Sequence, residues 1–96
     1  SSALSNEVKA SELSSGALDY QRQKEEAKAR RAVERELKQA EERSAAIDDE
    51  LRALEEKLAQ PEHATDTELF TQYSQLKQEQ EALLVRWEEL ALQLEA

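Results

Sequence analysis

The sequence predicts an all-α fold, a two-helix antiparallel coiled-coil hairpin with a flexible N-terminal linker. Three observations support this fold class. Residues 19–59 and 66–95 contain no Gly or Pro and consist mostly of good helix formers. Both stretches carry side chains at alternating spacings of four and three, the repeat of a coiled coil. The only proline, Pro61, lies between them, where it ends one helix and lets the chain turn back.

Residues 1–18 are expected to form the flexible linker. They hold six serines and the only glycine of the chain, and their few apolar residues do not continue into a longer pattern. The first helix is therefore placed at about 19–59. Its start could be capped by Ser14, Ser15 or Asp19.

Residues 60–65 predict a turn, because the residue before a proline disfavours the helical conformation. The second helix should then run from about residue 66 to about residue 95. Its start matches a capping box. In this motif the Thr65 side chain accepts from the Glu68 backbone N–H, and the Glu68 side chain reaches back to Thr65.

The predicted core is one seam along each helix. In the first helix the seam positions are Val33, Leu37, Ala40, Ser44, Ile47, Leu51, Leu54 and Leu58. In the second helix they are Leu69, Tyr73, Leu76, Gln80, Leu83, Trp87, Leu90 and Leu94. Folding the chain back at Pro61 pairs the two seams in layers whose residue numbers always sum to 127, such as 47 with 80. This constant sum predicts an antiparallel, monomeric hairpin in one register.

The same register places the only tryptophan, Trp87, opposite Ala40, where a small residue leaves room for the indole. Trp87 is therefore interpreted as a core residue. Its replacement by Ala should cost roughly 3–5 kcal/mol if the site is well buried. Ser44 and Gln80 are polar seam positions, which are expected to help fix the register at some cost in stability.

Composition excludes several classes of function. With 4% aromatic residues the chain cannot fill a thick globular core, and without cysteine it has neither disulfides nor a Cys-based zinc site. No apolar run approaches the roughly 20 residues of a membrane span, and no signal-peptide pattern is present. We therefore expect a soluble, cytoplasmic chain with no membrane contact.

No residue pattern predicts catalysis or a cofactor. Neighbouring carboxylates such as Asp48 and Asp49 should lie on a solvated helix face, with no pocket to shift their pKa. His63 lies alone among turn residues, so a metal site is not expected. A chain with one glycine also cannot build a phosphate-cradling loop. The segment is predicted to be non-catalytic, without metal or cofactor of its own.

Positive charge is concentrated in the first helix. Residues 20–43 hold eight basic and six acidic residues, a net charge of +2, whereas residues 44–96 hold four and thirteen, a net charge of −9. The base of the hairpin should therefore be basic and its tip acidic. The candidates for contact with nucleic acid are Arg22, Lys24, Lys28, Arg30, Arg31, Arg35 and Lys38. The alternative interpretation is a solvated helix with ion pairs between successive turns.

Three features carry a resemblance to a known family. They are Tyr20 with Lys24 near the helix start, Pro61 in the turn after "LEEKLAQPE", and "RWEEL" at residues 86–90. Over residues 19–95 the chain resembles the C-terminal coiled-coil domain of bacterial ABC-F ATPases, including Uup-like members, which are tandem ATP-binding cassette proteins without membrane domains.

The resemblance implies a parent protein that binds ATP and Mg through cassettes located in cis. It also implies a role on the ribosome in translation or, for Uup-like members, in DNA binding. The hairpin would then be an arm that contacts rRNA, ribosomal protein or DNA. The alternative function is a structural coiled-coil spacer or protein–protein interaction module with no nucleic-acid binding.

Overall fold

The computed structural model describes the backbone of residues 2–96 and the side chains of residues 14–96. The described chain contains helix α1 (Ser2–Leu58), a short 3₁₀ helix η1 (Pro61–His63) and helix α2 (Thr67–Glu95). It forms two compact units, one up to residue 32 and one from residue 33 to 96. The predicted all-α hairpin is confirmed, and it makes up the second unit.

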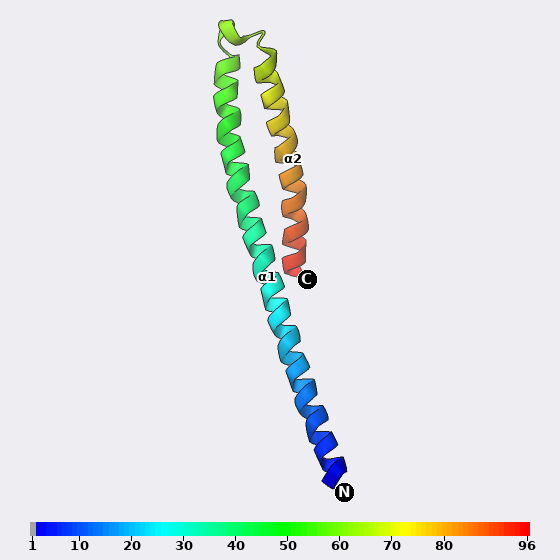
Figure 1. Ribbon diagram of the computed structural model, residues 1–96. Coiled ribbons are helices and arrows are strands. Elements are labelled where there is room, and N and C mark those ends of the chain that lie inside the picture. Colours follow the sequence, from blue (N-terminus) through cyan, green and yellow to red (C-terminus); the bar gives the residue numbers. More distant parts are fainter. Residues whose placement is uncertain (1) are drawn as a thin grey trace. The chain divides into compact units, whose positions relative to one another are not determined.

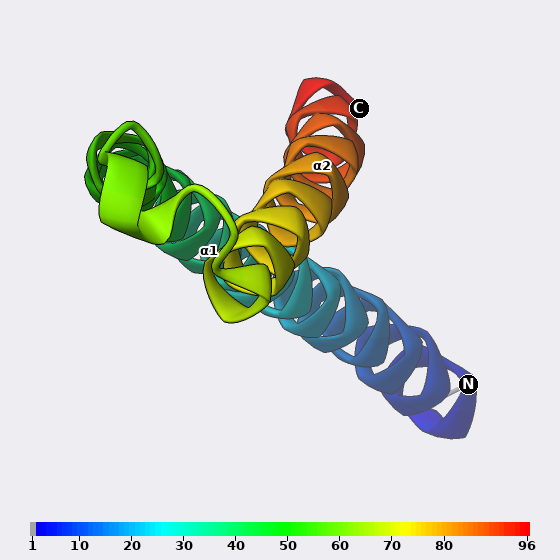
Figure 2. The ribbon, with the colours of Figure 1, turned by 90° about the horizontal axis from the view of Figure 1, so that it is seen from above.

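In the second unit, residues 33–58 of α1 lie beside α2 and run in the opposite direction, joined through η1 (Figure 1). Viewed from above, the two helices of this unit cross at an angle, as helices of a coiled coil do (Figure 2). Pro61 begins η1, where its missing N–H costs no helical hydrogen bond. The hairpin therefore turns where the sequence predicts.

The buried side chains all belong to the predicted seam. Among the described side chains, the buried ones are Ala40, Ile47, Leu51, Leu54 and Leu90. The other seam positions are half-buried, with the exception of Trp87. Both stripes thus pack against each other, and the apolar area that they remove from water is the main stabilising contribution in this unit.

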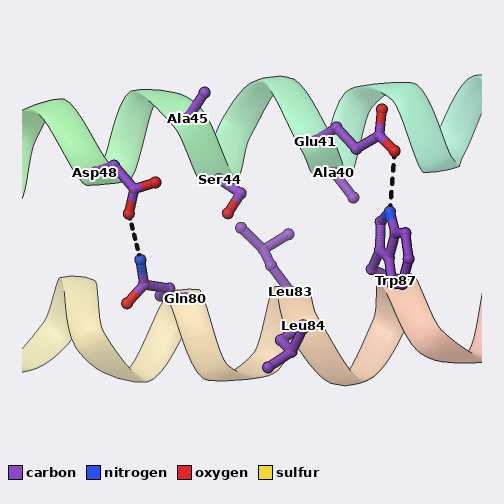
Figure 3. Close-up of a pocket in the computed structure, with 9 residues that line it drawn as sticks. All are labelled: Ala40, Glu41, Ser44, Ala45, Asp48, Gln80, Leu83, Leu84 and Trp87. Atoms are coloured by element: carbon purple, nitrogen blue, oxygen red, sulfur yellow. Dashed lines mark hydrogen bonds between the residues drawn. The ribbon is translucent and has the colours of Figure 1, made fainter.

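Three hydrogen bonds between the helices confirm the register. They join Tyr73 Oη to Glu55, Gln80 Nε2 to Asp48 and Trp87 Nε1 to Glu41, at 3.2, 2.6 and 3.0 Å. In each pair the residue numbers sum to 128. The predicted layers sum to 127, so each acceptor is the residue that comes directly after the seam residue opposite the donor. Each donor is a seam residue of α2, and each acceptor lies seven residues from the next along one edge of α1. Figure 3 shows two of these bonds.

The interpretation of Trp87 as a core residue was wrong, because the residue is exposed. Its ring lies across from Ala40, as the register predicts, but 38% of its surface stays exposed. The indole lies at the edge of the seam, where its N–H donates to the exposed Glu41 carboxylate. A tryptophan that buried this N–H would need an acceptor inside the seam, whereas at the edge the Glu41 carboxylate supplies one.

The start of α2 also differs from the predicted capping box. Asp66, not Thr65, caps the helix: its Oδ1 accepts from the backbone N–H groups of Glu68 and Leu69, at 3.1 and 3.3 Å. Asp66 has an extended backbone conformation, as a capping residue requires. Its negative carboxylate is also stabilised by the partial positive charge at the N-terminus of the helix. The helix therefore begins at Thr67, one residue later than predicted.

Helix α1 begins at Ser2, well before the predicted start near residue 19. Residues 2–18 contain no proline, and one glycine weakens a helix without ending it, so nothing in this stretch forces a break. An added Cβ at Gly16 would meet no neighbouring atom. Residue 1 lies outside the described residues, and the flexibility of residues 1–18 stays a prediction.

Candidate nucleic-acid interface

All seven predicted contact residues lie on α1 with exposed side chains. Arg22, Lys24, Lys28, Arg30 and Arg31 belong to the first unit, in which every residue from 14 to 32 is exposed. Arg35 and Lys38 belong to the second unit. In that unit the seam faces α2, so Arg35 and Lys38 lie off the seam on the outer part of α1.

Most of these cations make no ion pair with a described side chain. Arg22 Nη2 donates to Asp19 Oδ1 at 3.1 Å. Arg30 also interacts with another group. Among the seven predicted contact residues, those that make no ion pair with a described side chain are Lys24, Lys28, Arg31, Arg35 and Lys38; in the acidic part of the hairpin, Lys57 and Lys77 make none either. The five predicted contact residues without an ion pair form the set called the cation stripe below.

The members of the cation stripe share one spacing, which the sequence interpretation missed. Their numbers step by 4, 3, 4 and 3 along the sequence. Within the first unit this spacing puts Lys24, Lys28 and Arg31 on one face of the helix, and within the second unit it does the same for Arg35 and Lys38. This spacing could have been read from the sequence, whereas the absence of an ion pair with any described side chain at these five positions could be seen only in the structure.

Two other arginines, Arg43 and Arg86, form ion pairs between the two helices of the hairpin. The Arg43 guanidinium donates to both Glu79 carboxylate oxygens at 2.8 and 2.9 Å, and Arg86 makes the same two-pronged contact with Glu36. Hydrogen bonding to the arginines lowers the pKa of Glu79 and of Glu36 below the ordinary 4.5. The same bonds raise the pKa of both arginines.

These two ion pairs also select the register. If α2 slid by one heptad in one direction, Arg86 would meet Arg43 and Glu79 would meet Glu50. A slide in the other direction would bring Glu79 beside Glu36. Either slip places like charges side by side, so the alternation of sign along this edge opposes both.

The described residues also bear on two other functions, metal binding and membrane spanning. His63 Nδ1 lies 3.7 Å from Asp66 Oδ2, a contact between a 3₁₀ helix and the cap of α2. In the described part of the chain, no group of three or more His, Cys, Asp or Glu side chains could hold a metal ion. Across residues 2–96, neither helix is both long and apolar enough to cross a membrane.

Comparison with known proteins found no matching family model, no matching curated protein and no matching solved structure. The likeness to ABC-F ATPases therefore depends only on the residues quoted for it. The function has to be argued from the charges and contacts of the chain itself.

Proposed function

We propose that this chain is a non-catalytic arm that contacts nucleic acid, rRNA or DNA, through the cation stripe. The observation that carries the proposal is that five regularly spaced cations of α1 have no ion pair with a described side chain, whereas Arg43 and Arg86 each make a two-pronged ion pair between the helices. An unpaired, exposed cation can contact a phosphate without first breaking another ion pair. Each such contact also releases counterions from the nucleic acid.

The rest of the chain limits where a phosphate backbone can lie. After Lys38 the same spacing continues through Glu42, Ala45 and Asp49, so the sign of the charge changes along α1. The net charge of −9 over residues 44–96 repels phosphate from the hairpin tip. Contact is therefore confined to the basic part of α1.

The wider setting of the proposal follows from the resemblance to ABC-F ATPases. In that setting the arm works in the cytoplasm, and ATP and Mg belong to cassettes of the parent protein. The quoted motifs are compatible with an arm: Pro61 opens η1, Leu90 is buried and Arg86 pairs with Glu36. Tyr20 and Lys24 remain exposed, as residues that contact a partner would be.

The proposal can be tested with a charge-reversal variant and a matched control. The variant carries Lys28→Glu, Arg31→Glu and Arg35→Glu, and the control carries Arg52→Glu, Lys57→Glu and Lys77→Glu. All six side chains are exposed, and both variants change the net charge by the same amount. Binding to duplex DNA of about 20 base pairs and to an rRNA stem-loop is measured against salt concentration by fluorescence anisotropy.

The stripe variant should bind roughly tenfold or more weakly, and its log–log salt slope should fall by about three, one for each lost phosphate contact. The control should keep most of the slope of the unaltered chain. Equal losses in both variants, or binding that does not depend on salt, would contradict a contact through the stripe. If neither nucleic acid binds, the spacer or protein–protein function becomes the better explanation.

A further inference from the structure

An open groove of about 540 Å³ lies along one edge of the hairpin, between α1 and α2. Figure 3 shows its lining side chains extending from both helices. Its lining residues are Ala40, Glu41, Ser44, Ala45, Asp48, Gln80, Leu83, Leu84 and Trp87. The groove exists because Ala40 and Ser44 are the smallest side chains of the seam, so the layers there leave space that larger residues fill elsewhere.

The walls of the groove expose large apolar side chains. Leu84 is 57% exposed and Trp87 is 38% exposed, and both lie on α2. Across from them, Ala45 is exposed on α1. Large apolar side chains left open beside a groove are typical of surfaces that bind a partner.

Carboxylates surround these apolar walls. On α1, the four residues three or four positions from Ala45 are Glu41, Glu42, Asp48 and Asp49. On α2, the two charged residues at those spacings from Leu84 are Glu81 and Glu88. Residues at such spacings are neighbours on a helix surface, so six acidic side chains lie beside these two wall residues. The basic residues Arg52, which lies 3.7 Å from Asp49, and Lys77 lie nearer the hairpin tip, at these spacings from Asp48 and Gln80.

Two of the acidic residues also hold the groove in shape. Glu41 accepts from Trp87 Nε1 at 3.0 Å, and Asp48 accepts from Gln80 Nε2 at 2.6 Å (Figure 3). The indole and the amide are thereby fixed against α1. A partner would meet a wall that is already ordered, which lowers the entropic cost of binding.

We propose that this groove docks a basic amphipathic helix of a partner protein. Its α1 wall from Ala40 to Asp48 is about 12 Å long at 1.5 Å per residue, which suits two turns of a helix. Leucine-sized residues at i and i+3 or i+4 would lie against Leu84 and Trp87. Lysines or arginines on either side of them would face the six carboxylates.

Charge and side-chain size disfavour the other occupants. A phosphate backbone would be repelled by the acidic border. A second copy of this chain would have to offer its cation stripe, but residues 21–32 contain alanine as their only apolar residue type. That stretch has no large side chain to place between Leu84 and Trp87.

The experiment uses the full chain and a Trp-free, acetylated 14-residue peptide built from Leu, Lys and Ala, with leucines spaced 4 and 3 apart. A peptide of the same composition in scrambled order is the ligand control. Because the chain has one tryptophan, its emission reports directly on the groove wall. Binding is also followed by anisotropy of the fluorescein-labelled peptide, which allows variants to be compared.

Two pairs of matched variants separate the groove from general charge attraction. Leu84→Gln removes an apolar wall residue, and Val85→Gln changes a neighbour of equal 57% exposure that does not line the groove. Ala45→Arg fills the groove with a cation, and Ala46→Arg adds the same charge at the next exposed position. Helicity measured by circular dichroism checks that each variant folds.

We expect the ordered peptide to shift the Trp87 emission and to bind about tenfold more weakly to the Leu84→Gln and Ala45→Arg variants. The Val85→Gln and Ala46→Arg variants should stay within about twofold of the unaltered chain. Equal binding of the scrambled peptide, equal losses in all four variants, or no binding would overturn the proposal. So would a dimer in sedimentation that Leu84→Gln dissociates, because a second copy would then fill the groove.

Discussion

Trp87 illustrates how a seam residue can take on a second role. Its position in the repeat places it opposite Ala40, but the indole is too large to fit wholly between the helices. The ring therefore covers one end of the groove and anchors its N–H on Glu41. Its contribution to stability comes from the covered part of the ring and from one exposed hydrogen bond.

We expect Trp87→Ala to destabilise the hairpin by about 2 kcal/mol, less than the roughly 3–5 kcal/mol that full burial would cost. The reason is that 38% of the residue already faces solvent. Chemical unfolding followed by circular dichroism measures the difference. Trp87→Phe is the control, since it keeps an apolar ring and loses only the Nε1 donor. A cost for Trp87→Ala above 3 kcal/mol would show that the ring is more buried in solution.

At the residue scale, the sequence allowed the seam positions to be predicted but not their exposure. Ile47 and Leu90 are almost fully buried, whereas Trp87 occupies an equivalent seam position and is not. Exposure depends on how far a side chain projects past the seam, which the repeat does not encode. The cap of α2 was missed for a similar reason. Thr65 and Asp66 are both good capping residues, and backbone geometry decides between them.

At the scale of the helices, the two edges of the hairpin differ in chemistry. One edge carries hydrogen bonds from seam residues of α2 to Glu41, Asp48 and Glu55. The other edge carries the ion pairs of Arg43 and Arg86. The acceptors on the first edge recur every seven residues, and the charges on the second alternate in sign. The seam supplies the apolar area, and the edges select one register.

Exchanging the charges of one pair tests this role of the second edge. Arg43→Glu alone should lower the melting temperature, because it places a carboxylate against Glu79 and near Glu50. Adding Glu79→Arg should recover part of the loss, since the pair is restored with its polarity reversed. Thermal unfolding of both single variants and the double variant gives the coupling. No recovery in the double variant would mean that the pair does not contribute to the register.

The same ion pair predicts a pH dependence with a definite sign. The hydrogen bond from Arg43 lowers the folded-state pKa of Glu79 below 4.5, so its stabilising effect is present above that pH. It is lost as the pH falls through the lowered pKa. Glu79→Gln should therefore melt below the unaltered chain at pH 7, and the two melting temperatures should converge as the pH falls below 4.5 and through the lowered pKa. Glu81→Gln, at an exposed residue without an ion pair among the described side chains, is the charge-matched control.

The elements themselves were largely predictable, because the seam repeat, Pro61 and the constant layer sum are all local or pairwise features of the sequence. The ion pairs at the edge follow from the same register and could have been read from it. The N-terminal start of α1 could not. Residues 2–18 have neither a seam nor a strong breaker, so nothing in their pattern locates a helix end.

At the scale of the whole chain, charge and packing divide the sequence at different places. The compact hairpin begins at Val33, whereas the cation stripe extends from Lys24 to Lys38 and the acidic part follows it. Three of the five stripe cations thus belong to a stretch that adds no buried apolar side chain among the described residues. Under the proposed function, these three cations would serve contact with nucleic acid and not the stability of the hairpin.

A chain of residues 33–96 tests this division directly. It keeps every buried side chain of the described chain and all the cross-helix ion pairs, so its melting temperature should stay within a few degrees of the full chain's. It loses Lys24, Lys28 and Arg31, and its salt slope for DNA should therefore fall by about three or more. Peptide binding at the Trp87 groove should not change, because the groove lies wholly within residues 40–87.

A large drop in melting temperature would mean that residues before 33 stabilise the hairpin, and an unchanged salt slope would place the nucleic-acid contact elsewhere. The three measurements therefore separate folding, nucleic-acid contact and peptide docking within one variant.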